Sequence, residues 1–238
     1  MPDGATGNCG LSPIFASVPD FRRSYGATLA RVAPFAVFIL FIALQPLAAG
    51  LLDPRWWVAI RGIAAAALLL LFARSYVELR QRPTWMECFL AIVVGWVVFA
   101  AWVAFDWSWA GTAAGPGFDP RRPDGSLDPW LTALRVMGIV LAVPVMEELF
   151  WRSYVMRRID ARDFLAKDPR AVSALAFAVS CALFATEHTQ WLAGLLAGAA
   201  YGMLYMRSRN LWIPIVSHTT TNGTLAIWIL ATGNWQYW

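Results

Sequence analysis

The chain has 238 residues, of which 59% are hydrophobic and only 14% are charged, and it contains 14 tryptophans. Soluble proteins carry about 25% charged residues, so this composition excludes an ordinary soluble protein and indicates an integral membrane protein. The net charge is +4, but the basic residues are dispersed between apolar segments. This dispersal argues against nucleic-acid binding.

A polar segment, 1–26, precedes a single predicted transmembrane domain, 27–238. The polar segment has no apolar stretch followed by a cleavage site of small residues, so we expect no cleavable signal peptide. Stretches of about 17–25 mostly apolar residues are long enough to cross a bilayer, and they predict an all-α, polytopic transmembrane helical bundle of about seven spans, or eight. A polar loop outside the bilayer is predicted at 107–129. In chain order, the seven predicted spans are 31–52, 56–74, 86–106, 131–156, 171–188, 190–207 and 211–231.

The distribution of Lys and Arg predicts the orientation. If the N-terminus is cytoplasmic, the outer connections carry only Arg55, Arg121 and Arg122, and the inner ones carry most of the other basic residues. Basic residues favour the cytoplasmic side, so we expect the N-terminus inside and the C-terminus outside. Arg61 and Arg135 lie within spans but near their outer ends, where a long side chain can reach the interface.

The fourth predicted span contains a polar cluster that runs from Glu147 to Arg152. An ionisable side chain in hydrocarbon costs roughly 2.5–3.5 kcal/mol even on lenient scales, so such residues persist mainly where they face a cavity. Glu148 and Arg152 are i and i+4 on a helix and are expected to form an ion pair. Glu147 points about 100° away on a helix and is left free for acid–base chemistry. The alternative is that both carboxylates only hold helices together.

The fifth and seventh predicted spans each carry a polar pair with the same spacing. Phe184 and His188 are i and i+4, which puts an aromatic ring one turn from an imidazole, and His218 and Asn222 are likewise one turn apart. A single histidine near a helix end is more often a packed or interfacial residue. The threonines at 219–221 can bond to carbonyls of the preceding turn, so we assign them no chemical role.

In the sixth predicted span, Gly194, Gly198 and Gly202 recur every four residues. Small residues with this spacing let membrane helices approach closely, so this stripe is interpreted as a packing face.

The three motifs together resemble a known family. Glu-Glu-x-x-x-Arg, Phe-x-x-x-His and His-x-x-x-Asn, in this order on separate membrane helices within 131–222, are similar to the motifs of the CAAX prenyl protease and bacteriocin-processing family of intramembrane endopeptidases. The stretches Arg31-Val32-Ala33-Pro34-Phe35, 188–194 and 218–222 resemble more particularly the exosortase-associated bacterial branch. One departure is Ser153, because many relatives have glycine after the arginine.

This resemblance implies a proteolytic mechanism that needs no nucleophilic side chain. Glu147 would activate a water molecule with help from His188, and His218 and Asn222 would stabilise the tetrahedral oxyanion. The substrate would be a membrane-associated protein.

The resemblance also implies supporting roles, partners and a location. Glu148 and Arg152 would hold the site in place, and Phe184 would pack beneath the imidazole of His188. Exosortase-system proteins are expected partners beside the substrate and the lipid bilayer. The protein is expected in a bacterial inner membrane.

Zinc is the competing mechanism, since two histidines and a glutamate could supply three ligands and leave a position open for water. The sequence has no His-Glu-x-x-His motif, and the resemblance favours metal-free catalysis, so we expect no cofactor.

Depth in the membrane presents a conflict. Glu147 lies some 24 Å from the outer end of its predicted span, at about 1.5 Å per residue, whereas His188 falls at the outer end of its own. Straight, fully inserted helices keep the two apart. A kink at Pro144, or a turn recessed within the protein, would resolve the conflict.

Two other classes of function stay open. A proton-coupled carrier could use Glu147, His188 and His218 as a relay, although no inverted repeat or pair of broken helices supports it. A non-catalytic membrane scaffold could keep the same fold.

Overall fold

The computed structural model describes residues 21–48, 50–104 and 117–238. Most of the predicted polar segment 1–26 and the first part of the predicted loop 107–129 therefore lie outside the described residues. Within the described ranges the protein is built from helices, and the only extended pairing is an isolated bridge between Arg121 and Leu127. The predicted all-α fold is confirmed.

The long fourth helical stretch runs without a break from Pro129 to Asp160. It is made of α4, a π-helical turn η4, α5, a π-helical segment η5 and α6. The elements are α1 Phe21–Leu44, η1 Gln45–Ala48, α2 Pro54–Leu71, η2 Ala73–Ser75, η3 Val77–Arg80, α3 Trp85–Ala104, α4 Pro129–Met137, η4 Gly138–Ala142, α5 Val143–Glu147, η5 Glu148–Val155, α6 Met156–Asp160, η6 Pro169–Ala171, α7 Ala174–Ala185, α8 Trp191–Ser208, α9 Trp212–Thr232 and η7 Trp235–Tyr237.

Each of the seven predicted spans overlaps one helix or helical stretch. In the described residues, four of these are long and apolar enough to cross a membrane, namely Tyr25–Leu47, Pro54–Leu71, Trp85–Ala104 and Pro129–Asp160, so the chain is an integral membrane protein. The fifth predicted span, 171–188, is too long, because α7 covers only Ala174–Ala185. The cytoplasmic N-terminus stays a prediction.

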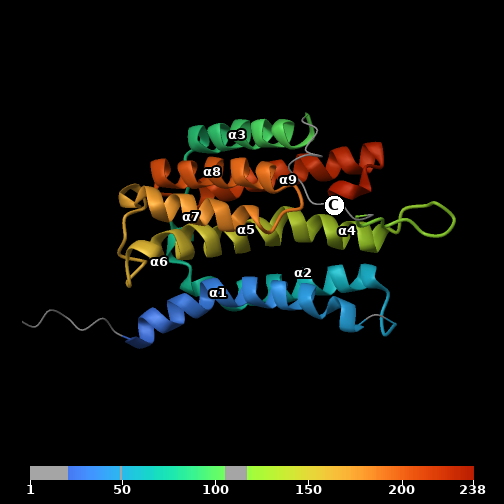
Figure 1. Ribbon diagram of the computed structural model, residues 1–238, viewed down its shortest axis with the longest axis horizontal. Helices are drawn as coiled ribbons and strands as arrows, with labels where there is room; N and C mark the ends of the chain where they lie inside the picture. Colours follow the sequence, from blue (N-terminus) through green and yellow to red (C-terminus); the bar gives the residue numbers. More distant parts are fainter. Residues whose placement is uncertain (1–20, 49, 105–116) are drawn as a thin grey trace, which may run out of the picture.

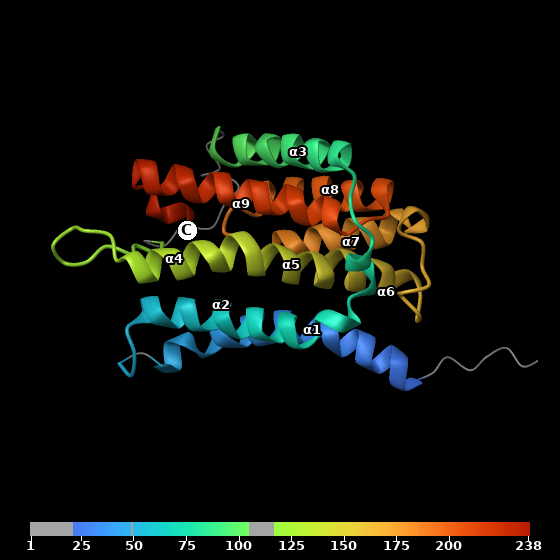
Figure 2. The ribbon, with the colours of Figure 1, turned by 180° about the vertical axis from the view of Figure 1, so that it is seen from behind.

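The helices lie side by side in layers (Figures 1 and 2). α3 lies along one outer side and packs against α8 and α9, whereas α1 and α2 pack together on the opposite side. The stretch from α4 to α6 runs between these layers and contacts α1, α2, α7 and α9. This central position lets side chains from the fourth helical stretch meet those of α7, α8 and α9.

Close approach of α7 and α8 depends on the predicted glycine stripe. A Cβ atom built at Gly198 would lie 3.2 Å from the ring of Phe184, and one at Gly202 would lie 2.8 Å from the ring of Phe177. No larger side chain fits at Gly202 without movement of Phe177, so the stripe is a packing face as predicted.

A buried charge network joins α1, the connection between α2 and α3, and the end of the fourth helical stretch. Glu78 pairs with Arg31 at 2.5 Å and with Arg157 at 2.9 Å, and it accepts a hydrogen bond from Ser153. Burial alone would raise the pKa of Glu78, but the hydrogen bonds and charge of Arg31, with the Ser153 hydrogen bond, outweigh it and lower the pKa. Ser153 thus has a structural role in this chain.

Candidate functional site

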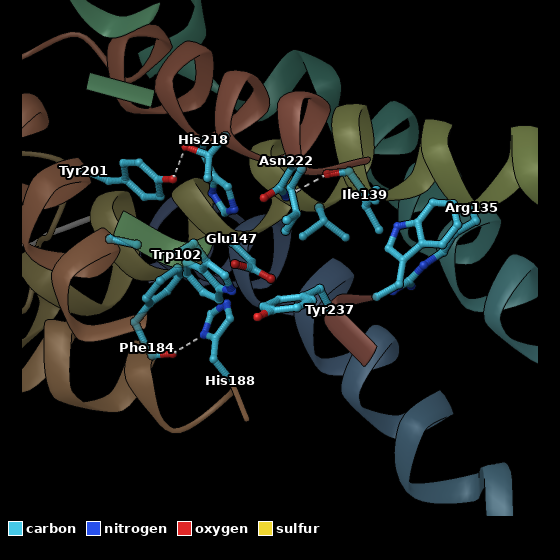
Figure 3. Close-up of a pocket in the computed structure, with 15 residues that line it drawn as sticks. Trp102, Arg135, Ile139, Glu147, Phe184, His188, Tyr201, His218, Asn222 and Tyr237 are labelled. Atoms are coloured by element: carbon cyan, nitrogen blue, oxygen red, sulfur yellow. Dashed lines mark hydrogen bonds between the residues drawn. The ribbon is translucent and has the colours of Figure 1, made fainter. Parts of the chain in front are cut away.

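A cavity of about 170 Å³ lies between the fourth helical stretch, the end of α7, and helices α8 and α9 (Figure 3). The four side chains that the sequence predicts as catalytic come from the fourth helical stretch, the turn after α7, and α9. All four line this cavity, and they are Glu147, His188, His218 and Asn222.

Glu147 reaches the cavity from the end of α5 (Figure 3). The residue is only 8% exposed, and its Oε2 atom has no hydrogen-bond partner among the described residues. Unpaired polar atoms are rare in protein interiors because they lose their hydration without compensation. Glu147 is therefore the acid of the pair that is available to a water molecule or a substrate, as its position in the sequence predicts.

Glu148 is fully buried and occupied by two partners. Its Oε2 lies 3.1 Å from Arg152 Nε, which is the ion pair predicted from the i, i+4 spacing, and its Oε1 lies 3.0 Å from His218 Nδ1. Arg152 also donates to the carbonyl of Gly198 at 3.2 Å. Glu148 thus joins the fourth helical stretch to α9, and Arg152 joins it to α8.

His188 lies beyond the end of α7, in the turn before α8, rather than on a helix as the sequence predicts. Its Nδ1 lies 3.0 Å from the carbonyl oxygen of Phe184. Since a carbonyl only accepts, Nδ1 carries the proton and Nε2 keeps its lone pair in the neutral ring. Gly194 makes room for the ring, because a Cβ atom there would lie 3.1 Å from His188 Nδ1.

The short α7 also resolves the conflict over depth. His188 follows a 12-residue helix that is too short to cross a bilayer, for which about 20 residues are needed. The turn after α7 therefore lies beside the cavity, where irregular backbone is tolerated in membrane proteins. His188 and Glu147 can line one cavity because α7 is a short helix, whereas the fourth helical stretch is long enough to cross the membrane.

Phe184 is buried at the end of α7. Its ring centroid lies 4.8 Å from that of His188 and 6.1 Å from that of His218. The guanidinium of Arg152 lies over the same ring at 4.3 Å. The ring packs against His188 as predicted, and it also separates that histidine from Arg152.

Asn222 reaches back to the fourth helical stretch, where its Nδ2 donates to the carbonyl of Ile139 at 2.8 Å. One turn earlier on α9, the Thr219 hydroxyl donates to the carbonyl of Val140 at 3.0 Å. Each carbonyl lacks its helical donor for a different reason. The Val143 N–H bonds to Gly138 in the π-helical turn rather than to Ile139. Pro144, four residues after Val140, has no N–H to donate. Thr219 is therefore a link between helices, and not a donor to its own preceding turn as predicted.

Several cavity residues were missed by the sequence interpretation. Tyr201 of α8 stacks on His218 with a centroid distance of 4.8 Å and donates to the Thr221 hydroxyl at 2.8 Å. Because it follows Gly198 by three residues, Tyr201 lies near the glycine face of α8, and this spacing could have indicated that it packs against a neighbouring helix. Trp102 of α3 and Tyr237 of η7 also line the cavity. Glu187, beside His188 in the sequence, is outside the lining and accepts a hydrogen bond from Trp151 at 3.0 Å.

In the described part of the chain, no group of three or more His, Cys, Asp and Glu side chains has the arrangement of a metal site. The Nδ1 atoms of His188 and His218 already face protein oxygens. Independence from a cofactor stays a prediction.

Comparison with known proteins gives one positive result. Residues 129–224 match the family model described as type II CAAX prenyl endopeptidase Rce1-like. The match begins at the first residue of α4 and includes all the predicted site residues, so the resemblance to this protease family is confirmed. The exosortase-associated branch is not addressed by this match and stays a prediction. No curated protein and no solved structure matches the chain.

Proposed function

Because the segment 129–224 matches the type II CAAX prenyl endopeptidase Rce1-like family model, we propose that this membrane protein is an intramembrane endopeptidase. It hydrolyses a peptide bond of a membrane-associated protein with a water molecule that Glu147 activates. The observation that carries the proposal is the unpaired, buried carboxylate of Glu147 in a cavity that it shares with His188, His218 and Asn222.

Glu147 is the general base. Its neighbour Glu148 is engaged by Arg152 and His218, whereas Oε2 of Glu147 has neither a hydrogen bond nor an ion pair to the described residues. Water exclusion by the surrounding helices strengthens the electrostatic action of such a carboxylate. Glu147 thus transfers the proton, and Glu148 holds Arg152 and His218 in position.

His188 helps to orient the water. With its Nδ1 proton directed at the Phe184 carbonyl, its Nε2 presents a lone pair, and the carboxylate of Glu147 presents another acceptor. A water molecule held by both donates its two hydrogens to them, so its own lone pairs are left for the carbonyl carbon of the substrate.

His218 and Asn222 stabilise the oxyanion. A histidine that gives its Nδ1 proton to Glu148 can donate from Nε2 only as an imidazolium, and the carboxylate of Glu148 stabilises that cation. Asn222 uses one amide hydrogen on Ile139 and keeps a second for the substrate. A donor of this kind contributes about 2.7–4 kcal/mol in other enzymes.

The proton balance is simple. As the water oxygen bonds to the carbonyl carbon, one water proton moves to Glu147. When the tetrahedral intermediate collapses, the C–N bond breaks and Glu147 returns this proton to the leaving amine. The products are a peptide with a new carboxyl terminus and a peptide with a new amino terminus, and no metal or side-chain nucleophile takes part.

The location and the partners follow from the resemblance, and the orientation follows from the distribution of Lys and Arg. We propose a bacterial inner membrane, with the N-terminus in the cytoplasm, and exosortase-system proteins as partners. A scaffold or a proton-coupled carrier would use the same polar cluster without cutting a peptide bond.

Comparative proteomics tests the proposal. Membranes from cells that carry the wild-type chain are compared with membranes from cells that carry Glu147→Gln. We expect at least one membrane-associated protein to be shortened only with the wild type, and purified wild type to cut a peptide that spans the same bond. Identical peptide termini in both membranes would favour the scaffold or the carrier.

A further inference from the structure

Arg135 lines the same cavity and has no anion as a partner. Within the described residues its guanidinium makes no hydrogen bond or ion pair, and its Nε atom is buried without a partner. By contrast, the buried arginines Arg31, Arg152 and Arg157 are each paired with a glutamate. Arg135 is half-buried and faces the cavity. A charged group that loses part of its hydration is normally paired, because the loss is otherwise not compensated.

The surroundings of Arg135 offer it aromatic faces rather than negative charge. Its guanidinium lies 5.5 Å from the ring of Phe118 and 6.0 Å from that of Trp238. The nearby charge of Arg61 adds repulsion. Arg61 has no ion pair or hydrogen bond in the described residues either, and it stacks on Phe38 at 5.1 Å. This region therefore carries positive charge that an incoming anion would neutralise.

Arg135 lies at the end of the cavity away from Phe184 and His188 (Figure 3). It precedes Glu147 by 12 residues on one continuous helical stretch. At about 1.5 Å per residue, and less through the π-helical turn, the two lie roughly 15–18 Å apart along the axis. An extended peptide covers this distance with about five residues.

We propose that Arg135 is a specificity residue that binds a carboxylate of the peptide substrate, about five residues from the bond that is cut. This inference rests on the proposed peptidase function and names the chemical class of its substrate. Arginine suits the task because its planar guanidinium binds a carboxylate through two parallel hydrogen bonds. The carboxylate can come from the C-terminus of the peptide or from an acidic side chain.

A binding experiment separates these sources and does not depend on cleavage. Glu147→Gln protein is immobilised in detergent and offered three libraries of apolar decapeptides with randomised sequences. The first has a free C-terminal carboxylate, the second is amidated, and the third is amidated but contains one glutamate at a varied position. Retained peptides are counted by mass spectrometry.

We expect the first or the third library to be retained at least tenfold over the second. This preference should disappear when Arg135→Gln is added to Glu147→Gln, and Arg135→Lys should keep part of it. The matched control is Arg158→Gln, which removes one exposed charge from α6 outside the cavity. It should keep the full preference.

Equal retention of the three libraries, or a preference that survives Arg135→Gln, would overturn the inference. If retention is equal but phosphatidylglycerol nanodiscs stabilise the Arg135 protein more than Arg135→Gln, the anion is a lipid phosphate and the inference is wrong. Cleavage by wild-type protein without any carboxylate preference refutes this inference alone. A carboxylate preference without cleavage counts against the proposed function alone.

Discussion

The Nδ1 atom of His218 lies 3.0 Å from Oε1 of Glu148, a contact between α9 and the fourth helical stretch. Because Glu148 pairs with Arg152 at the same time, one carboxylate holds a histidine and an arginine in fixed positions. The adjacent Glu147 has no such partner. Of the two neighbouring acids, one is paired and the other is not. Substitution of Glu147 should therefore affect cleavage, and substitution of Glu148 should affect stability.

Glu147→Gln should abolish peptide cleavage and leave the protein folded. The amide keeps the shape of the side chain but cannot accept the proton of the water. Cleavage of a defined peptide and thermal unfolding, both measured in detergent, check this expectation. Near-wild-type cleavage would refute the role of Glu147 as the base.

Glu148→Gln should instead lower stability. It leaves Arg152 without its carboxylate in a buried position, and removal of one partner of a buried ion pair costs roughly 3–5 kcal/mol. We expect low yield or a clearly lower melting temperature than that of Glu147→Gln. Equal melting temperatures of the two variants would contradict this division of roles.

The network around Glu78 should make stability depend on acidic pH. The pKa of Glu78 is lowered in the folded protein from its ordinary value of 4.5. Between the two values the unfolded chain binds more protons, so the contribution of Glu78 is present above the unfolded pKa. It is lost as the pH falls through the folded pKa.

Glu78→Gln should therefore lower the melting temperature at neutral pH and flatten its fall below pH ~4.5. The matched control is Asp163→Asn, which removes an exposed carboxylate that makes no ion pair. Melting temperatures of the three proteins are compared from neutral to acidic pH in one detergent. A difference between wild type and Glu78→Gln that does not change with pH would argue against this linkage.

The sequence predicted those contacts that depend on one helix alone. Glu148 and Arg152 meet because i and i+4 share a face, whatever the rest of the chain does. The position of His188 could not be predicted in the same way. It depends on α7 ending at Ala185 and on a tight turn whose Glu187 and His188 N–H groups bond to carbonyls three residues earlier.

Contacts between helices were the hardest to predict. The stacking of Tyr201 on His218 requires the relative rotation of α8 and α9, which hydrophobic patterns do not fix. The contact of Thr219 with Val140 could have been predicted. Pro144 inside a span leaves the carbonyl four residues earlier, that of Val140, without its usual donor. A membrane interior requires that this carbonyl find another donor, which is the Thr219 hydroxyl.

Activity should survive thorough chelation. The proposed mechanism places the proton on Glu147 and the oxyanion on side-chain donors, so no step needs a metal. Cleavage rates before and after dialysis against a strong chelator, with metal analysis of the same samples, check this expectation. One zinc per chain, with activity lost on its removal and restored on its return, would instead establish a metalloprotease.

Asn222→Ala should lower kcat by about 10²–10³-fold with little change in KM, because an oxyanion donor acts only in the transition state. The substitution also removes the hydrogen bond to Ile139, which costs about 1 kcal/mol of stability.

Thr219→Val is the matched control, since it removes the neighbouring bond to Val140 from a side chain that does not line the cavity. It should lose a similar amount of stability and keep its kcat. Steady-state kinetics of both variants on one fluorogenic peptide decide the matter. A loss confined to KM, or an equal fall of kcat in both, would refute the oxyanion role of Asn222.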